Sequence, residues 1–102
     1  MKKTVIVTGA NTGIGRATGM GLAGQNCHVI LACRNKDKGE TARTEIIEKT
    51  GNKEIDLLLL DLSSQKSIHE FTHNIIAAYP RLDVLINNAG VSMQTLKHGA
   101  GN

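Results

Sequence analysis

Three glycines, Gly9, Gly13 and Gly15, follow directly on a short apolar run, Thr4–Val7. A turn of this composition lets backbone N–H groups come close to a ligand, because no side chain stands between them. When such a turn opens a helix, the free N–H groups and the positive end of the helix dipole favour a phosphate. The spacing G-x-x-x-G-x-G differs from the dinucleotide fingerprint G-x-G-x-x-G, so a purely structural turn is the alternative for this motif alone.

Further polar residues stand where the ligand of such a turn would need them. Arg34 lies about 20 residues beyond the glycines, the distance at which a dinucleotide-binding chain reads the ribose of its ligand. A guanidinium there suits the 2′-phosphate of NADP, whereas an NAD site usually carries an acid. A solvated surface charge is the alternative for Arg34. A third strand is expected to end in Asp61–Leu62 and a fourth in Asn87–Gly90, and both would return to the same edge of the sheet.

The elements that must position these residues follow from the hydrophobic pattern. Short apolar runs predict buried strands at Thr4–Val7, at His28–Cys33, within Ile55–Leu62 and at Leu82–Gly90. Helical periodicity predicts helices over about 13–25 and 37–50, and a third that begins at Ser63 or Ser64. The stop signals are Asn26, Gly51 and Pro80, and the apolar stripe of the third helix comprises Ile68, Phe71, Ile75 and Tyr79.

Strands that alternate with helices predict an α/β fold. Helical crossovers between parallel strands give a Rossmann-like, doubly wound parallel sheet, here ending after the fourth strand with the order 3-2-1-4. We expect residues 1–91 to form this unit and residues 92–102 to be an irregular tail.

Three segments together resemble the short-chain dehydrogenase/reductase family. They are "TGANTGIG" (Thr8–Gly15), "DL" (Asp61–Leu62) and "NNAG" (Asn87–Gly90), in this order and at this spacing. "LACRNKDKGE" and "LDLSSQKSIHEF" are similar to the branch of the family that holds the retinol dehydrogenases and the WW-domain oxidoreductases. The resemblance covers nearly the whole chain as far as Val91.

The resemblance implies a role for each matching residue. Thr8–Gly15 would hold the pyrophosphate of a dinucleotide, Arg34 would meet the 2′-phosphate, and Asp61–Leu62 would flank the adenine. Asn87, Ala89 and Gly90 would line the adenine-ribose side. NADP is the expected cofactor, with NAD less favoured. The expected cofactor-binding residues are Thr8, Gly9, Asn11, Thr12, Gly13, Ile14, Gly15, Arg34, Asn35, Asp61, Leu62, Asn87, Ala89 and Gly90.

The chemistry of that family needs residues that these 102 positions do not offer. Its members use a tyrosine, a lysine four residues later, a serine and an asparagine, all beyond the segment that matches Asn87–Gly90. Here the one tyrosine, Tyr79, is followed four residues later by Asp83, and Ser92 lies too close to that segment. We therefore assign no catalytic residue, and expect the inactive cofactor-binding portion, as a fragment or truncated product, of an oxidoreductase acting on carbonyl and alcohol substrates. The alternatives are a stand-alone nucleotide-binding or interaction module without catalysis, and a remnant that folds but binds poorly.

One further motif, "HEFTH" (His69–His73), matches the H-E-x-x-H pattern of zinc proteases. The apolar stripe of its helix would leave both histidines towards solvent, and a catalytic zinc needs three protein ligands in a shaped cavity. We therefore expect no metal site. His28 and His98 are interpreted as surface residues.

Composition limits the remaining possibilities. The chain carries a net charge of +3 with 40% hydrophobic and 2% aromatic residues, which is typical of one small domain with an aliphatic core. Its scattered lysines and arginines argue against a nucleic-acid partner, and no segment is long enough to span a membrane. Cys27 and Cys33 are interpreted as reduced and buried, so an intracellular, cytoplasmic protein is expected.

The predicted fourth strand, Asp83–Asn87, would lie at the edge of the sheet. Its apolar residues would face both sides, and only the charge of Asp83 would protect the edge. We expect self-association through this edge, most simply as a two-fold dimer.

Overall fold

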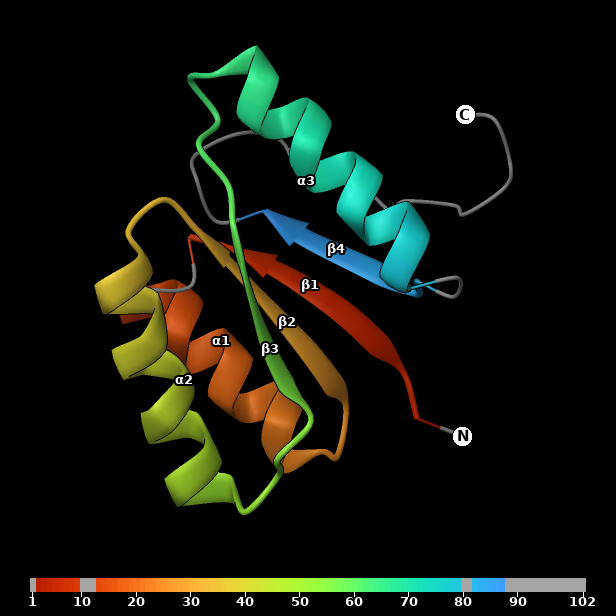
Figure 1. Ribbon diagram of the computed structural model, residues 1–102. Helices are drawn as coiled ribbons and strands as arrows, with labels where there is room; N and C mark the ends of the chain where they lie inside the picture. The colour runs from red at the N-terminus through yellow and green to blue at the C-terminus, as the bar shows by residue number, and fades with distance from the viewer. Residues whose placement is uncertain (1, 10–12, 80–81, 88–102) are drawn as a thin grey trace.

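The computed structural model describes residues 2–9, 13–79 and 82–87, and these form a four-stranded parallel sheet with three helices (Figure 1). The sheet order is β3-β2-β1-β4, as the sequence predicts. The chain runs through β1 (Thr4–Thr8), α1 (Gly13–Gly24), β2 (His28–Cys33), α2 (Lys36–Thr50), β3 (Ile55–Leu59), α3 (Gln65–Ala78) and β4 (Val84–Asn87). The predicted α/β, Rossmann-like fold is confirmed.

The sheet lies between two layers of helix. Helices α1 and α2 cover one face and α3 covers the other (Figure 1). Alternate residues of each strand point to opposite faces, so the core divides into two clusters. One lies against α1 and α2 and includes Val7, Leu31 and Ile46; the other lies against α3 and includes Ile30 and Ile75. Aliphatic side chains make up nearly all of both, as the low aromatic content predicts.

Local signals place the helix ends. Asn26 follows α1 with φ 67°, and Gly51 follows α2 with φ 75°, so both predicted left-handed stops are confirmed. Asn35 caps α2, because its side chain accepts a hydrogen bond from the N–H of Lys38. Of the two serines considered for α3, Ser64 is the cap, and it accepts from the N–H of Ser67.

The glycines within α1 differ in their contribution to packing. A Cβ at Gly19 would lie 3.2 Å from Leu31 Cδ2 and 3.4 Å from Ile46 Cδ1, so this glycine lets α1 approach β2 and α2 closely. At Gly21 and Gly24 a Cβ would meet no heavy atom of the described residues within 4 Å. These two glycines therefore weaken the helix without any gain in packing.

Three expectations need correction. The third strand ends at Leu59 rather than within 60–62, because the chain then turns towards α3. Ile68 is 37% exposed although Ile75, on the same stripe, is 4% exposed. The first turn of α3 extends beyond the strand ends in Figure 1, so the sheet does not lie beneath the start of this helix. The carboxylate of Asp83 accepts a hydrogen bond from the N–H of Thr4 at 2.8 Å. It therefore contacts β1, whereas the sequence predicted that its charge protects the outer edge of β4.

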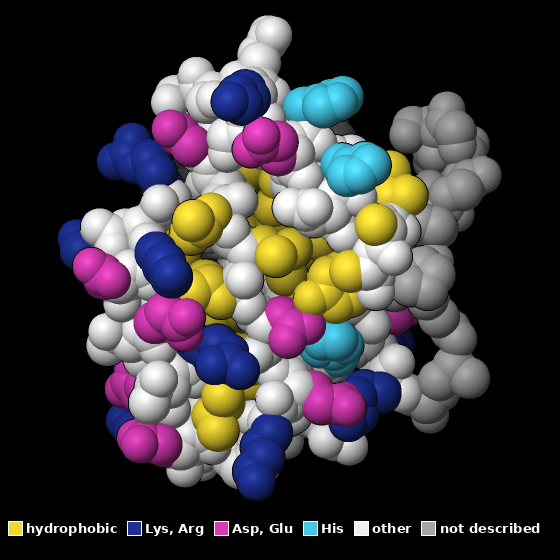
Figure 2. All heavy atoms as spheres, in the orientation of Figure 1, with side chains coloured by type: hydrophobic (Ala, Val, Ile, Leu, Met, Phe, Trp, Pro, Cys, Tyr) yellow, Lys and Arg dark blue, Asp and Glu magenta, His cyan; other side chains and the backbone are white. Residues whose placement is uncertain are grey.

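Some apolar side chains stay on the surface. Figure 2 shows hydrophobic side chains gathered in the middle of one face, with charged side chains and histidines around them. The large hydrophobic residues exposed in the described part of the chain are Ile14, Leu59, Leu62, Ile68 and Ile76.

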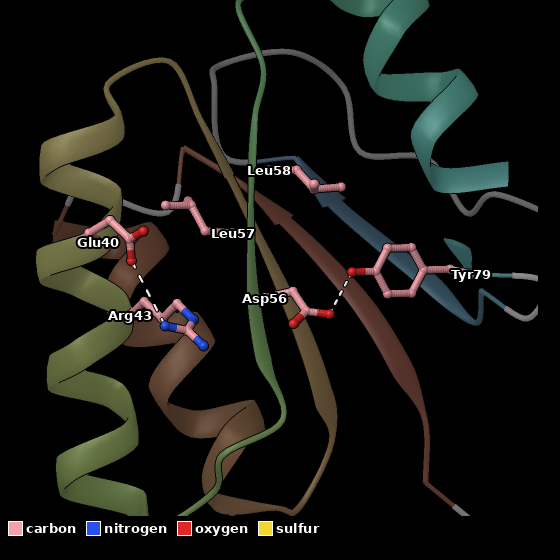
Figure 3. A pocket seen from close by; sticks show the side chains of 6 residues that line it. All are labelled: Glu40, Arg43, Asp56, Leu57, Leu58 and Tyr79. Carbon is pink, nitrogen blue, oxygen red and sulfur yellow. Dashed lines mark hydrogen bonds and ion pairs between the residues drawn. The ribbon is translucent and has the colours of Figure 1, made fainter. Parts of the chain in front are cut away.

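His28 is the fourth correction, because it is half-buried in a polar cluster instead of lying on the surface. Its Nε2 lies 2.8 Å from Asp56 Oδ2, and the Tyr79 hydroxyl donates to the same oxygen at 2.5 Å. The rings of His28 and Tyr79 meet edge to face with centroids 5.5 Å apart. Figure 3 shows Asp56 and Tyr79 pointing toward one another. The cluster joins the start of β2, β3 and the end of α3.

The electrostatics of this cluster follow from its hydrogen bonds. Burial alone raises the pKa of Asp56, but the hydrogen bonds from Tyr79 and His28 together outweigh it and leave that pKa below its ordinary value. Burial, reinforced by the hydrogen bond to Asp56, raises the pKa of Tyr79. Both shifts favour an ionised Asp56 beside a neutral phenol.

Tyr79→Phe is expected to lower the free energy of unfolding by about 1 kcal/mol at neutral pH, because it removes one hydrogen bond to a partly exposed carboxylate. A carboxyl whose pKa is lowered by folding stabilises the protein above its unfolded pKa, and this contribution is lost as the pH falls through the folded pKa. The difference between parent and variant should therefore shrink below about pH 4. Urea unfolding at pH 6 and pH 3 measures it, and an equal difference at both pH values would contradict the assignment.

Candidate nucleotide-binding site

A hollow of about 260 Å³ opens at the carboxyl ends of β1, β2 and β3. Ligands of doubly wound sheets bind at this edge. Five of the predicted site residues line it together: Thr8, Gly9, Arg34, Asp61 and Leu62. The hollow has four further lining residues that are not among the predicted site residues: Ala32, Cys33, Leu60 and Ser63.

The glycine turn joins this hollow to the start of α1. Gly9 has φ 62°, the left-handed conformation that glycine adopts without strain, which agrees with the predicted sharp turn. Gly13 is the first residue of α1 and is exposed, and a Cβ there would meet no described heavy atom within 4 Å. Gly15 is buried, and Ile14 between them is 74% exposed. Open space therefore lies beside the first turn of α1, where backbone N–H groups favour an anion.

Asp61 is held by the turn that follows β3. Its Oδ1 accepts the N–H of Ser63 at 3.0 Å and the hydroxyl of Ser63 at 2.6 Å. These hydrogen bonds, the hydroxyl first, lower the pKa of Asp61, and the charge of Arg34 lowers it further. The carboxylate is thus ionised, oriented and close enough to Arg34 to feel its charge. The Asp-x-Ser spacing is the local signal that could have added Ser63 to the predicted site.

Arg34 and Asn35 have different surroundings although they are neighbours. Arg34 is exposed and lines the hollow. The side chain of Asn35 is engaged in capping α2, and its carbonyl accepts a hydrogen bond from the Cys33 thiol at 3.3 Å. Burial raises the pKa of that thiol. Asn35 therefore shapes the turn that carries Arg34, and it does not line the hollow.

The fourth strand brings one more predicted residue to this edge. Asn87 ends β4 and is paired in register with Thr8, the last residue of β1. The Thr8 hydroxyl donates to the carbonyl of Ile86 at 3.4 Å, which also links the two strand ends. The other predicted residues, Asn11, Thr12, Ala89 and Gly90, lie outside the described residues.

The one tyrosine and the metal-binding residue types were also considered as site residues. Tyr79 lies near the amino ends of the strands, away from the hollow, in the polar cluster with His28 and Asp56. Within residues 2–9, 13–79 and 82–87, no group of three or more histidine, cysteine or acidic side chains could hold a metal ion. In the same part of the chain, no helix has the length and apolarity needed to cross a bilayer.

Comparison with known proteins gives a consistent set of relatives. The chain is 53% identical over 89 residues to human retinol dehydrogenase 13, covering 87% of this chain and 27% of that protein. It is 50% identical over 91 residues to mouse retinol dehydrogenase 11, covering 89% and 29%. It is 43% identical over 90 residues to bovine dehydrogenase/reductase SDR family member 13, covering 88% and 24%. The chain thus spans about a quarter of the length of the curated relatives it matches.

Solved structures agree with these relatives in fold. Menthone neomenthol reductase from Mentha piperita superposes with a TM-score of 0.82 at 34% identity, over 89% of this chain and 32% of that one. A short chain dehydrogenase from Shigella flexneri complexed with NADP superposes with a TM-score of 0.78 at 35% identity, over 87% and 38%. A family model described as short chain dehydrogenase matches residues 3–100, almost the full sequence. The chain therefore belongs to the short chain dehydrogenase family.

Proposed function

We propose that this chain binds NADP(H) in the hollow at the carboxyl ends of β1, β2 and β3. The proposal makes it the cofactor-binding portion of an oxidoreductase that interconverts carbonyl and alcohol groups. The observation that carries it is the meeting of Arg34, Asp61 and the turn at Gly9 around one hollow, beside the open first turn of α1. A dinucleotide needs this combination of phosphate-binding backbone and ribose-reading side chain.

The residues present fit the parts of the cofactor one by one. The first turn of α1 suits the pyrophosphate, because a side chain is absent at Gly13 and the helix dipole adds positive potential. The exposed guanidinium of Arg34 suits a 2′-phosphate. The ionised, oriented Asp61 and the neighbouring Leu62, 43% exposed, offer a polar and an apolar contact for the adenine.

The relatives support the same choice of cofactor. The Shigella flexneri structure is a complex with NADP, and another neighbour, YwfH, is described as an NADPH dependent reductase. YwfH is 35% identical to this chain and superposes with a TM-score of 0.80. The retinol dehydrogenases among the relatives are named for an alcohol substrate, which supports the carbonyl and alcohol class.

The chain's own residues supply binding and not proton transfer in this proposal. The nicotinamide carries the hydride when the cofactor is bound. The one tyrosine donates its hydroxyl to Asp56 in a cluster away from the hollow, which supports a structural role for it. A stand-alone nucleotide-binding or interaction module without catalysis is favoured by the same observation and stays the second candidate.

The compartment and the oligomeric state of the chain stay proposals. Cys27 and Cys33 are free and buried, which supports an intracellular, reducing location. Strand β4 lies at the end of the sheet order, which supports its pairing with a second copy of the chain. Light scattering over a concentration series measures this association.

Arg34→Asp is expected to reverse the cofactor preference of the chain. The parent should bind NADP more tightly than NAD by about tenfold or more, because a charge-assisted contact to the 2′-phosphate contributes about 1.5–3 kcal/mol. In the variant a carboxylate would repel that phosphate and would suit the 2′-hydroxyl of NAD. Calorimetric titration with both cofactors measures the ratio.

Lys36→Asp is the matched control for Arg34→Asp. Lys36 is exposed and begins α2 two residues further on, but it does not line the hollow. The same charge change there should leave the ratio of the two affinities close to that of the parent. Equal affinity of the parent for both cofactors would overturn the assignment of Arg34, whereas failure to bind either one would overturn the proposed function itself.

A further inference from the structure

The outward side of α3 carries two histidines that neither the fold nor the nucleotide site uses. His69 and His73 are both exposed, and they lie four residues apart, which places them about one turn apart on the same side of the helix. Ile75 and Phe71, which face the core, mark the opposite side. Figure 2 shows histidine side chains next to each other over α3. They line a shallow hollow together with Glu70 and Asn74.

The surroundings leave both imidazoles available. No hydrogen bond or ion pair within the described part of the chain engages either His69 or His73. His28, by contrast, is held by Asp56 and Tyr79. The helix itself is regular from Gln65 to Ala78, so the backbone fixes the relation between the two side chains.

We propose that His69 and His73 form a two-imidazole site for a late first-row divalent cation, of the class that includes Ni²⁺ and Zn²⁺. Side chains four residues apart on a helix have Cβ atoms about 5–6 Å apart, so two imidazoles can reach one ion at metal–nitrogen distances of about 2.0–2.1 Å. Imidazole nitrogen suits Zn, Cu and Ni, whereas Mg²⁺ and Ca²⁺ take oxygen ligands. The ligand set therefore selects the class of ion.

This site differs from the zinc-protease centre that the H-E-x-x-H motif suggests. A catalytic zinc needs three protein ligands, and in the described part of the chain no third ligand completes the group. Water would occupy the remaining coordination positions of the ion, so the proposal is a binding site and assigns no reaction to it. The hollow on α3 shares no lining residue with the nucleotide hollow, and the two sites are therefore independent.

Titration of the full chain with NiCl₂ tests the site. The titration is done at slightly alkaline pH, because the metal binds the neutral imidazole. We expect one Ni²⁺ per chain, and a loss of affinity of about tenfold or more in His73→Gln, equivalent to at least about 1.4 kcal/mol. Ni²⁺ should raise the melting temperature of the parent and not that of the variant, since an ion that binds only the folded state stabilises it.

A second variant tests the spacing rather than the number of histidines. His73→Gln combined with Asn74→His keeps two imidazoles on α3 but moves one by about 100° around the helix, away from His69. It should bind Ni²⁺ as weakly as His73→Gln alone. Circular dichroism verifies that both variants fold.

Three results would overturn the proposal. They are no Ni²⁺ binding by the parent, equal affinity in the parent and either variant, and Mg²⁺ binding as tight as that of Ni²⁺. None of them bears on NADP binding, so this test and that of the nucleotide site fail separately.

Discussion

Gly13→Val is expected to abolish nucleotide binding while the fold stays intact. Gly13 is exposed at the start of α1, and a Cβ there meets no described heavy atom within 4 Å, so the folded chain accepts a side chain. The two methyl groups of valine would stand beside the first turn of α1, in the space that the proposal gives to the pyrophosphate. The affinity for NADP should fall by about a hundredfold or more, which corresponds to about 2.8 kcal/mol.

Gly21→Val is the matched control for this experiment. Gly21 lies on the same helix, is exposed, and also faces open space, but it is two turns further from the hollow. Both variants replace an exposed glycine of α1 with valine in open space, and they differ in their distance from the proposed phosphate site. Calorimetric titration with NADP should find parental affinity in Gly21→Val. Parental affinity in Gly13→Val would show that the glycine turn is structural only.

Most of the fold could be predicted because its signals are local. Val5, Ile6 and Val7 form an apolar, β-branched run that only a strand buried on both faces can satisfy, and the structure buries all three. Asn26 and Gly51 ended their helices as expected, since few residues adopt positive φ. The prediction that Ile68 is buried was wrong. The helical stripe shows which side of α3 faces inward, but not how far the sheet extends beneath the helix.

Part of the candidate site could be predicted from the topology of the sheet. Arg34 and Asp61 end up on one hollow because the carboxyl ends of parallel strands share one edge, which topology alone dictates. The family resemblance implies that Asn35 binds the cofactor, but its side chain caps α2 instead. The resemblance does not reveal this capping role. The cluster of His28, Asp56 and Tyr79 joins residues from three elements, and no local pattern connects them.

The sequence does not show that the packing of α2 against the sheet depends on Gly39. It lies within α2, where a glycine lowers helix stability by about 1 kcal/mol relative to alanine, so composition suggests that it could be replaced with gain. The structure shows the opposite. A Cβ there would lie 2.6 Å from Cys33 Sγ and 2.7 Å from Leu57 Cδ1, closer than side-chain carbons approach in folded proteins.

Gly39→Val is expected to lower the free energy of unfolding by about 3 kcal/mol, the upper part of the range for overpacked cores. Domains are stable by only about 5–15 kcal/mol, so the variant should lose a large share of its stability. Urea unfolding measures the change. Gly21→Ala, on α1 in open space, is the control, and it should stabilise the chain by up to about 1 kcal/mol.

The cause of this loss can be separated from the loss itself. If the clash with Leu57 contributes, Leu57→Ala should relieve part of it, and the double variant should be less destabilised than the sum of the single ones. Strict additivity would contradict the contact. The other clash is with Cys33. Both Cys33 and the next residue, Arg34, line the hollow of the candidate nucleotide-binding site. Gly39→Val should therefore also weaken NADP binding, although Gly39 does not line that hollow, because α2 must move away from the strand end that carries Arg34.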